Sequence, residues 1–188
     1  MNDAAACLVG AHWASQGKHR LAAGLRLQVT RGLRPSEMLN LEPADFTFPS
    51  SLLNNTTSAL VVRLGTRVGT KAKREQHIIL IQTSEFAQLI DLLERIANET
   101  PIGCKMFPHT IDQYRREIQK VEKQCSLSLG WTPHSPRSGF ASDGIVQGKP
   151  FQELKQTGHG MAESSFRICI NIIASITILL KFYPSPSV

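Results

Sequence analysis

Two basic clusters, far apart in the chain, carry residue types that could hold a phosphate. The first covers residues 30–41 and contains Arg34, and the second covers residues 132–141 and contains His134 and Arg137. Guanidinium groups bind phosphate oxygens through paired hydrogen bonds, and an imidazole exchanges its proton near neutral pH. These residues therefore predict a site that holds a phosphate and moves a proton beside it.

The bulk composition is typical of one basic globular domain. The chain has 188 residues, of which 41% are hydrophobic, and its 21 lysine and arginine residues outnumber 15 aspartate and glutamate residues. This balance favours polyanionic partners. The N-terminus lacks the pattern of a signal peptide, and the apolar stretch at 168–182 is shorter than the ~20 residues of a membrane helix. We expect no membrane partner and an intracellular location, in the nucleus of a eukaryote or the cytoplasm of a prokaryote.

Cysteine and histidine spacing gives no metal motif. The four cysteines are Cys7, Cys104, Cys125 and Cys169. They are far apart and form no C-x-x-C pair, so we expect reduced, mostly buried thiols rather than a zinc site or a disulfide framework. His109, His134 and His159 include no pair at helical i, i+4 spacing and have no cysteine partner. The sequence therefore predicts neither a metal nor a cofactor.

Helical patterns flank the first cluster and continue after it. Apolar residues recur at helical spacing over 18–29, and Pro35 suits the first turn of the short helix that follows. An amphipathic helix is predicted over 84–98, with Ser84 as its cap. Thr110 and Gln113 form a capping-box pattern that opens a further helix.

Strand patterns and a second set of helix signals complete the prediction. Residues 45–49 begin a stretch of β character, and residues 59–64 and 77–81 are rich in β-forming types. The glycine-marked turn between the last two runs is strongly basic. Thr132 and Pro133 predict the start of a helix that places His134 and Arg137 one turn apart. A short helix is predicted over 152–156. The expected fold class is mainly α with a small antiparallel β-sheet.

Taken in order, these motifs resemble the catalytic domain of the tyrosine recombinases, the phage-integrase family, over about residues 21–173. Residues 30–41 are similar to the family's first arginine motif, with Arg34 and Glu37 on its arginine and acidic positions. The basic turn matches the family's β-turn lysine, most naturally Lys71, with Lys73 as the competitor. Residues 132–141 resemble its His-x-x-Arg box. Residues 154–160 resemble the element that carries its second histidine or tryptophan.

The resemblance implies a DNA breaking-rejoining fold and a metal-free phosphoryl transfer on double-stranded DNA. In the family a tyrosine attacks a DNA phosphate and forms a 3′-phosphotyrosyl link. Arg34 and Arg137 would stabilise charge at phosphorus, and Glu37 would orient its neighbours. His134 would transfer a proton, and Lys71 would protonate the leaving 5′ oxygen. Further DNA-binding candidates are Arg67, Lys73, Arg74, Arg115 and Arg116, although the last two fit a solvated helix face better than a specific DNA reader.

The nucleophile position departs from the family pattern. The family's tyrosine follows its second histidine or tryptophan by nine residues, which leads from His159 to Ile168 and from Gly160 to Cys169. The flanking sequence favours the second register, in which Cys169 replaces the tyrosine and His159 is only a neighbour. The side chain of Cys169 is too short to reach where a phenolic oxygen would, so we expect strand cleavage to be lost. The only tyrosines are Tyr114 and Tyr183.

The expected organisation is an N-terminal remnant over 1–17, a recombinase catalytic-like domain over 18–173 and an apolar tail over 174–188. We expect no counterpart of the family's N-terminal core-binding domain, which clamps the other side of the duplex. We therefore expect a fragment or truncated copy that binds DNA weakly and in a salt-sensitive way. The alternative hypothesis is a non-catalytic helical protein-interaction module or a relic fragment of a mobile element. In either case the apolar C-terminal segment could dock on a partner or build a homo-oligomer.

Overall fold

The computed structural model describes residues 1–51, 58–65 and 76–157. Within these ranges the chain forms helices and one small antiparallel sheet, which confirms the predicted fold class. In chain order the elements are α1 (Asp3–Ser15), α2 (His19–Arg31), α3 (Pro35–Leu39), the 3-10 turn η1 (Pro43–Asp45), β1 (Phe46–Thr47), the 3-10 turn η2 (Pro49–Ser51), β2 (Ala59–Leu64), β3 (Gln76–Ile81), α4 (Ala87–Glu99), α5 (Ile111–Gln124), α6 (Ser135–Val146) and α7 (Phe151–Thr157).

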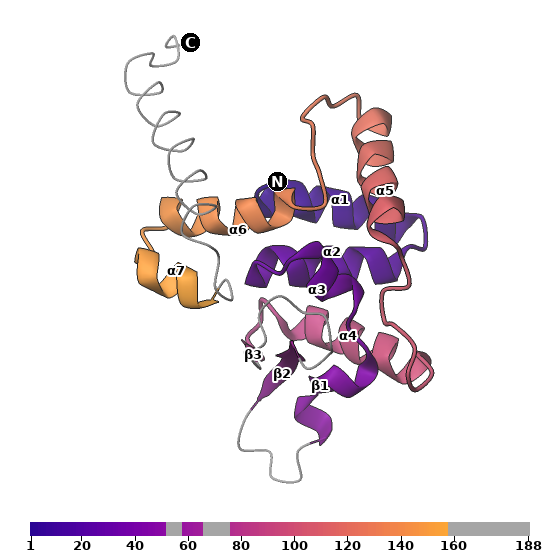
Figure 1. The fold of residues 1–188 in the computed structure, drawn as a ribbon, viewed down its shortest axis with the longest axis vertical. Helices are drawn as coiled ribbons and strands as arrows, with labels where there is room; N and C mark the ends of the chain where they lie inside the picture. Colours follow the sequence, from indigo (N-terminus) through magenta and orange to yellow (C-terminus); the bar gives the residue numbers. More distant parts are fainter. Residues whose placement is uncertain (52–57, 66–75, 158–188) are drawn as a thin grey trace.

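Helix α2 is the central element of the domain. Helices α1 and α6 lie on one side of it, and α4 with the sheet lies on the other (Figure 1). Leu21, Leu25 and Leu27 of α2 are almost completely excluded from solvent, because neighbours cover the helix on both sides. This burial confirms the helix predicted over 18–29. The C-terminal end of α2 leads directly into the first basic cluster.

The sheet has the strand order β1-β2-β3, with antiparallel neighbours throughout. Val62 of the middle strand lies opposite Phe46 of β1 and Ile78 of β3. Alternate side chains enter the core, as the two-residue period of a strand requires, while Ile79 and Ile81 of β3 remain exposed. The strands predicted at 59–64 and 77–81 are confirmed. The basic turn between them lies outside the described residues.

Helix α1, within the segment that the sequence analysis set apart as a remnant, shares the core of the rest of the domain. Its Trp13 is fully buried in the main hydrophobic cluster. Asp3 accepts a hydrogen bond from the Arg26 guanidinium of α2 at 2.6 Å, and its own amide donates to Asp143 of α6 at 2.7 Å. Helix α1 therefore connects α2 to the helix of the second basic cluster.

Two local predictions have opposite outcomes. The capping box is confirmed, because the Gln113 amide donates to the Thr110 hydroxyl at 3.2 Å and the Thr110 amide donates to the Gln113 side chain at 2.7 Å. The Ser84 cap is wrong. Phe86 is the N-cap of α4, since a turn closed by hydrogen bonds to the Thr83 carbonyl precedes the helix.

The prediction of mostly buried cysteines is also wrong for the described part of the chain. Cys7, Cys104 and Cys125 are all exposed and form no disulfide. Cys7 lies on the outer face of α1, where its sulfur accepts a hydrogen bond from Arg26 at 3.2 Å.

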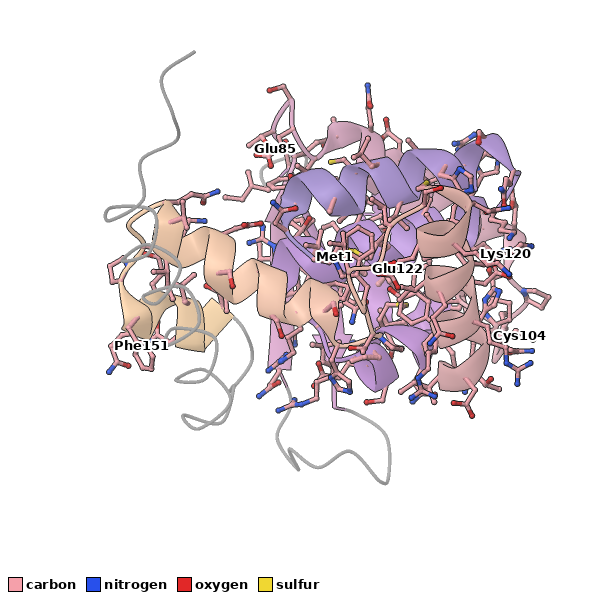
Figure 2. The ribbon with its side chains drawn as sticks, turned by 90° about the horizontal axis from the view of Figure 1, so that it is seen from above. Met1, Glu85, Cys104, Lys120, Glu122 and Phe151 are labelled. Atoms are coloured by element: carbon pink, nitrogen blue, oxygen red, sulfur yellow. The ribbon has the colours of Figure 1, made fainter. Side chains whose placement is uncertain are left out.

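Helices α6 and α7 carry a second, smaller core. Phe140, Ala141 and Leu154 are buried together, with Phe151 packed against them. Figure 2 shows Phe151 at one end of the molecule and Lys120 of α5 near the opposite end. Within the described ranges, no helix is both long enough and apolar enough to cross a membrane. Helix α7 confirms the short helix predicted over 152–156.

Candidate functional site

The first basic cluster is shaped by a tight turn at the end of α2. Gly32 ends the helix with φ +63°, in the left-handed region where a side chain is strained. A Cβ there would also lie 2.6 Å from the Phe140 ring, so α6 packs directly on this glycine. The chain then reverses, and Arg34 is the N-cap of α3 with Pro35 in the first turn. The turn places Arg34 next to α6.

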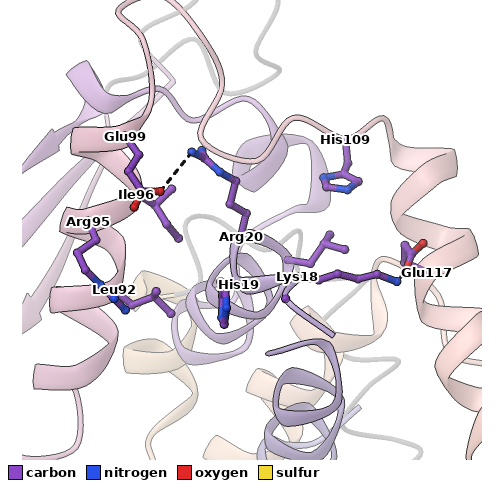
Figure 3. Close-up of a pocket in the computed structure, with 11 residues that line it drawn as sticks. Lys18, His19, Arg20, Leu92, Arg95, Ile96, Glu99, His109 and Glu117 are labelled. Atoms are coloured by element: carbon purple, nitrogen blue, oxygen red, sulfur yellow. Dashed lines mark hydrogen bonds and ion pairs between the residues drawn. The ribbon is translucent and has the colours of Figure 1, made fainter. Parts of the chain in front are cut away.

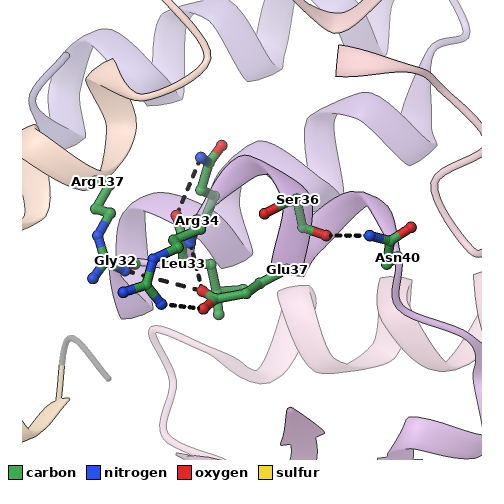
Figure 4. A network of polar contacts seen from close by, with 8 residues as sticks. Gly32, Leu33, Arg34, Ser36, Glu37, Asn40 and Arg137 are labelled. Carbon is green, nitrogen blue, oxygen red and sulfur yellow. Dashed lines mark hydrogen bonds and ion pairs between the residues drawn. The ribbon is translucent and has the colours of Figure 1, made fainter. Parts of the chain in front are cut away.

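Glu37 joins Arg34 to Arg137 of the second cluster (Figure 4). Its carboxylate accepts the Arg34 backbone amide at 2.7 Å and the Arg34 guanidinium at 2.5 Å. The Arg137 guanidinium lies 4.0 Å from Oε2 of the same carboxylate, the oxygen that accepts the Arg34 backbone amide. Two guanidiniums from distant parts of the sequence thus meet one carboxylate, and positive charge exceeds negative charge within this group of three.

The two arginines differ in their exposure. The Arg137 side chain is only 9% exposed, and its guanidinium donates to the Gly32 carbonyl. The Arg34 side chain is 32% exposed. Arg137 is therefore fixed by backbone and carboxylate, whereas about a third of the Arg34 side chain stays accessible.

His134 lies directly before α6 and is its N-cap residue. The predicted helix start at Thr132 and Pro133 is wrong, because the Thr132 amide donates to the Ser135 hydroxyl at 2.9 Å and closes a turn there. The helix begins only at Ser135. His134 therefore lies at the helix start rather than within its first turn.

The environment of His134 lowers its pKa below the ordinary value of 6.5. Partial withdrawal of the ring from water is the main cause, although the residue as a whole is exposed. The positive charges of Arg137, Arg34 and Arg115 act in the same direction. His134 is therefore neutral at pH 7 and able to accept a proton. Three arginines from different elements therefore lie close enough to His134 to disfavour its protonated form.

A buried polar network that the sequence analysis missed ties the two clusters together. Gln28 of α2 is fully buried and donates to the Leu33 carbonyl at 3.2 Å and to the Pro133 carbonyl at 2.9 Å. The Tyr114 hydroxyl donates to the Gln28 side-chain oxygen at 2.8 Å. The available signal was a glutamine among the apolar positions of an otherwise well-packed helix.

Glu122 of α5 organises the linker that leads to the second cluster. This carboxylate is nearly buried and accepts the backbone amides of Leu129 and Trp131, each at 3.1 Å. Figure 2 shows Glu122 near the centre of the molecule, whereas Lys120 of the same helix lies on its outer side. The linker is therefore held just before residues 132–134, a role that no motif indicated.

The remaining predicted site residues fall into two groups. Arg115 and Arg116 are exposed on α5, where Arg115 pairs with Asp112 and still contributes to the field at His134. The others lie outside the described residues, and their roles stay predictions. They are Arg67, Lys71, Lys73, Arg74, His159 and Cys169.

A second collection of charged groups surrounds a hollow of about 410 Å³ at the start of α2 (Figure 3). Lys18 pairs with Glu117 at 2.5 Å, and Arg20 lies 3.9 Å from Glu99. The Arg20 guanidinium also donates to the Thr100 hydroxyl and to the Met106 carbonyl. Each of these two cations has its own carboxylate, whereas Arg34 and Arg137 share one, so the hollow is a weaker candidate for a phosphate site. Within the described ranges, no cluster of three or more His, Cys, Asp or Glu side chains could hold a metal ion.

The fold has clear relatives among solved structures. No protein-family model matches the chain, and no curated protein does. The XerH site-specific recombinase bound to palindromic difH substrate, in a post-cleavage complex, superposes with a TM-score of 0.67 at 15% identity. The match covers 94% of this chain and 50% of that chain. This chain has the fold of a tyrosine-recombinase catalytic domain.

A second XerH complex gives the same result. The pre-cleavage complex with difH substrate superposes with a TM-score of 0.66 at 17% identity, over 94% of this chain and 52% of that one. The chain thus spans about half the length of the recombinase chains that it matches. The resemblance inferred from the arginine motifs is confirmed at the level of the tyrosine-recombinase fold.

Proposed function

We propose that this domain binds the phosphate backbone of double-stranded DNA with Arg34 and Arg137, as a recombinase-like domain of the DNA integration and recombination type. The observation that carries the proposal is the sharing of Glu37 by two guanidiniums beside His134. Three arginine charges act on that one imidazole. Such a field attracts an anion, and Arg34 is partly exposed to meet it.

The XerH complexes supply independent support for DNA as the ligand. In both complexes XerH is bound to difH substrate, and this chain shares their fold. The formal net charge of +6 is consistent with a polyanion. A domain with this role would act in the nucleus of a eukaryote or the cytoplasm of a prokaryote.

We further propose that strand cleavage is degenerate. The family register places Ile168 or Cys169 where a tyrosine is needed. Tyr114 is a poor substitute, because it is fully buried and its hydroxyl is engaged with Gln28. Burial also raises the pKa of the Tyr114 phenol far above its usual value, which disfavours the nucleophilic phenolate.

The binding proposal is tested by fluorescence anisotropy with a labelled duplex at two salt concentrations. We expect the association constant to fall with salt, with a log–log slope of about −1 for each phosphate contact. Absent binding, or binding that does not weaken with salt, would instead favour the protein-interaction module. The alternative therefore has its own distinct outcome in the same experiment.

The cleavage proposal is tested with a suicide DNA substrate that traps a covalent intermediate. We expect no covalent adduct from the natural sequence, and an adduct would overturn the proposed loss of cleavage. Cys169→Tyr and Ile168→Tyr restore a phenol in the two registers. If both variants bind DNA and remain inert, the defect extends beyond the nucleophile.

A further inference from the structure

Gln28 is placed where one side chain can control both basic clusters. Leu33, whose carbonyl accepts one of its amide hydrogens, directly precedes Arg34. Pro133, whose carbonyl accepts the other, directly precedes His134. These carbonyls belong to segments separated by a hundred residues of chain, yet a single amide nitrogen joins them. The two clusters are therefore fixed to each other immediately beside their functional residues.

Tyr114 determines which way the Gln28 amide faces. Its hydroxyl donates to the amide oxygen at 2.8 Å, so the nitrogen must face the two carbonyls. A flipped amide would place its oxygen against two carbonyl oxygens and leave both hydrogen bonds unmade. All polar atoms of the Gln28 side chain are satisfied in the observed orientation only. Helix α5 thus acts on the site through α2, without Tyr114 contacting either arginine.

We propose that Gln28 is a positioning residue, oriented by Tyr114, which holds Arg34 in register with His134 and Arg137. The consequence for DNA binding rests on the proposed function, whereas the geometry can be tested without DNA. An apolar side chain of similar size would fill the same space in the core. The buried amide adds a directional link between two loops, and buried polar networks of this kind specify geometry beyond packing.

The test without DNA uses His134 as a reporter in NMR titrations of the full chain. Arg34, Arg137 and Arg115 are the charged groups that act on it. Gln28→Met keeps the length of the side chain and removes both donors, so the segment before His134 is released. We expect the pKa of His134 to rise toward its ordinary value as the ring gains contact with water and moves away from the arginine charges. The pKa of His109, which lies outside this network, should stay unchanged.

Two further variants keep the test decisive. Tyr114→Phe keeps the ring and loses only the hydroxyl, so it should shift the His134 titration in the same direction by less than Gln28→Met. If Gln28→Met does not fold, Tyr114→Phe decides the matter. Ile118→Val, on the same buried face of α5, removes one methylene without touching the network and should leave His134 unchanged. An unaltered His134 titration in folded Gln28→Met, or in Tyr114→Phe if Gln28→Met does not fold, would overturn the positioning role.

Anisotropy with labelled duplex DNA adds the functional outcome. We expect Gln28→Met to bind at least about tenfold more weakly than the natural sequence, because small misplacements of positioned groups have large effects. Ile118→Val should bind as the natural sequence does. If the natural sequence does not bind DNA, the proposed function fails while the His134 titration still decides the role of Gln28. If Gln28→Met binds DNA with unchanged affinity, the amide does not position the arginines.

Discussion

The two ends of α2 carry similar residues and differ in how charge is distributed. At the N-terminal end, Lys18 pairs with Glu117 and Arg20 lies near Glu99, so each of these cations has its own carboxylate. At the C-terminal end, Arg34 and Arg137 meet the same carboxylate, Glu37. The first arrangement ties helices together, and the second concentrates positive charge. The number of arginines alone would not distinguish these two charge arrangements.

The pKa values of His109, beside the N-terminal end of α2, and His134, beside its C-terminal end, reflect this difference in charge. Burial is the main cause that lowers the pKa of both His109 and His134. At His109 the charge of Glu117 opposes that of Lys18, so the two effects offset each other. At His134 every charge contribution comes from an arginine and acts in the same direction. Charge effects from arginines alone, as at His134, favour an anionic ligand, whereas the opposed effects at His109 are typical of a structural ion-pair cluster.

Removal of Arg137 should have the largest effect. Arg137→Ala leaves Glu37 without one of its two cations and leaves the Gly32 carbonyl without its donor. Glu37 keeps Arg34 as its partner, so the main loss is the donor to the buried Gly32 carbonyl, which should cost about 1–3 kcal/mol of stability, and DNA binding should be lost as well. Urea unfolding and anisotropy measure the two effects. Arg137→Lys keeps the charge without the planar fork, so it should recover part of the stability and little of the affinity. Full affinity in Arg137→Ala would contradict the shared-carboxylate site.

Removal of Arg20 should affect stability without affecting DNA binding. Arg20→Ala loses hydrogen bonds to Thr100 and to the Met106 carbonyl, which should destabilise the domain by about 1–2 kcal/mol. Its affinity for duplex DNA should stay within about twofold, since the charge removed is already compensated. Thermal or urea unfolding, run beside anisotropy, checks both statements. A loss of affinity as large as that of an Arg34 variant would erase the contrast between the two ends.

The smallest effect is on the pH dependence of stability. Both histidines have a lowered pKa in the folded state, so the unfolded state binds more protons in acid. The two histidines therefore contribute fully to folding stability above pH 6.5, and this contribution is lost as the pH falls from 6.5 through their pKa values in the folded state. His134→Gln and His109→Gln should each reduce the acid destabilisation seen in urea unfolding.

Salt separates the two histidines. High salt screens the arginine field at His134 and should raise the pKa of His134 more than that of His109. NMR titrations at two salt concentrations measure this difference. If salt changed the two pKa values equally, burial alone would account for the lowered pKa of both histidines.

The sequence predicted the elements with strong periodicity and little of what connects them. The apolar spacing of α2, the runs of β-forming residues in β2 and β3 and the Thr110–Gln113 capping box are local patterns, and the structure confirms them. The Ser84 cap and the Thr132–Pro133 helix start failed because nearby turns compete for the same backbone groups.

The candidate site shows the same division. The resemblance named Arg34, Glu37, His134 and Arg137, and the structure brings these residues together. Their catalytic roles stay predictions. No motif could identify Gln28 or Glu122. Gln28 binds a backbone carbonyl far away in the sequence, and Glu122 binds backbone amides of an irregular loop. Such contacts follow from packing and have no fixed spacing.

The most direct test of the account compares two arginines that are matched in exposure. The side chains of Arg34 and Arg20 are 32% and 31% exposed; Arg20 lies in the first turn of α2, and Arg34 follows the last residue of α2 as the N-cap of α3. Anisotropy with a labelled duplex at two salt concentrations is measured for the natural sequence, Arg34→Ala and Arg20→Ala. We predict that Arg34→Ala weakens binding about tenfold and lowers the salt slope by about one phosphate contact, while Arg20→Ala changes neither. Equal losses in the two variants, or no loss in Arg34→Ala, would contradict a phosphate site at the C-terminal end of α2.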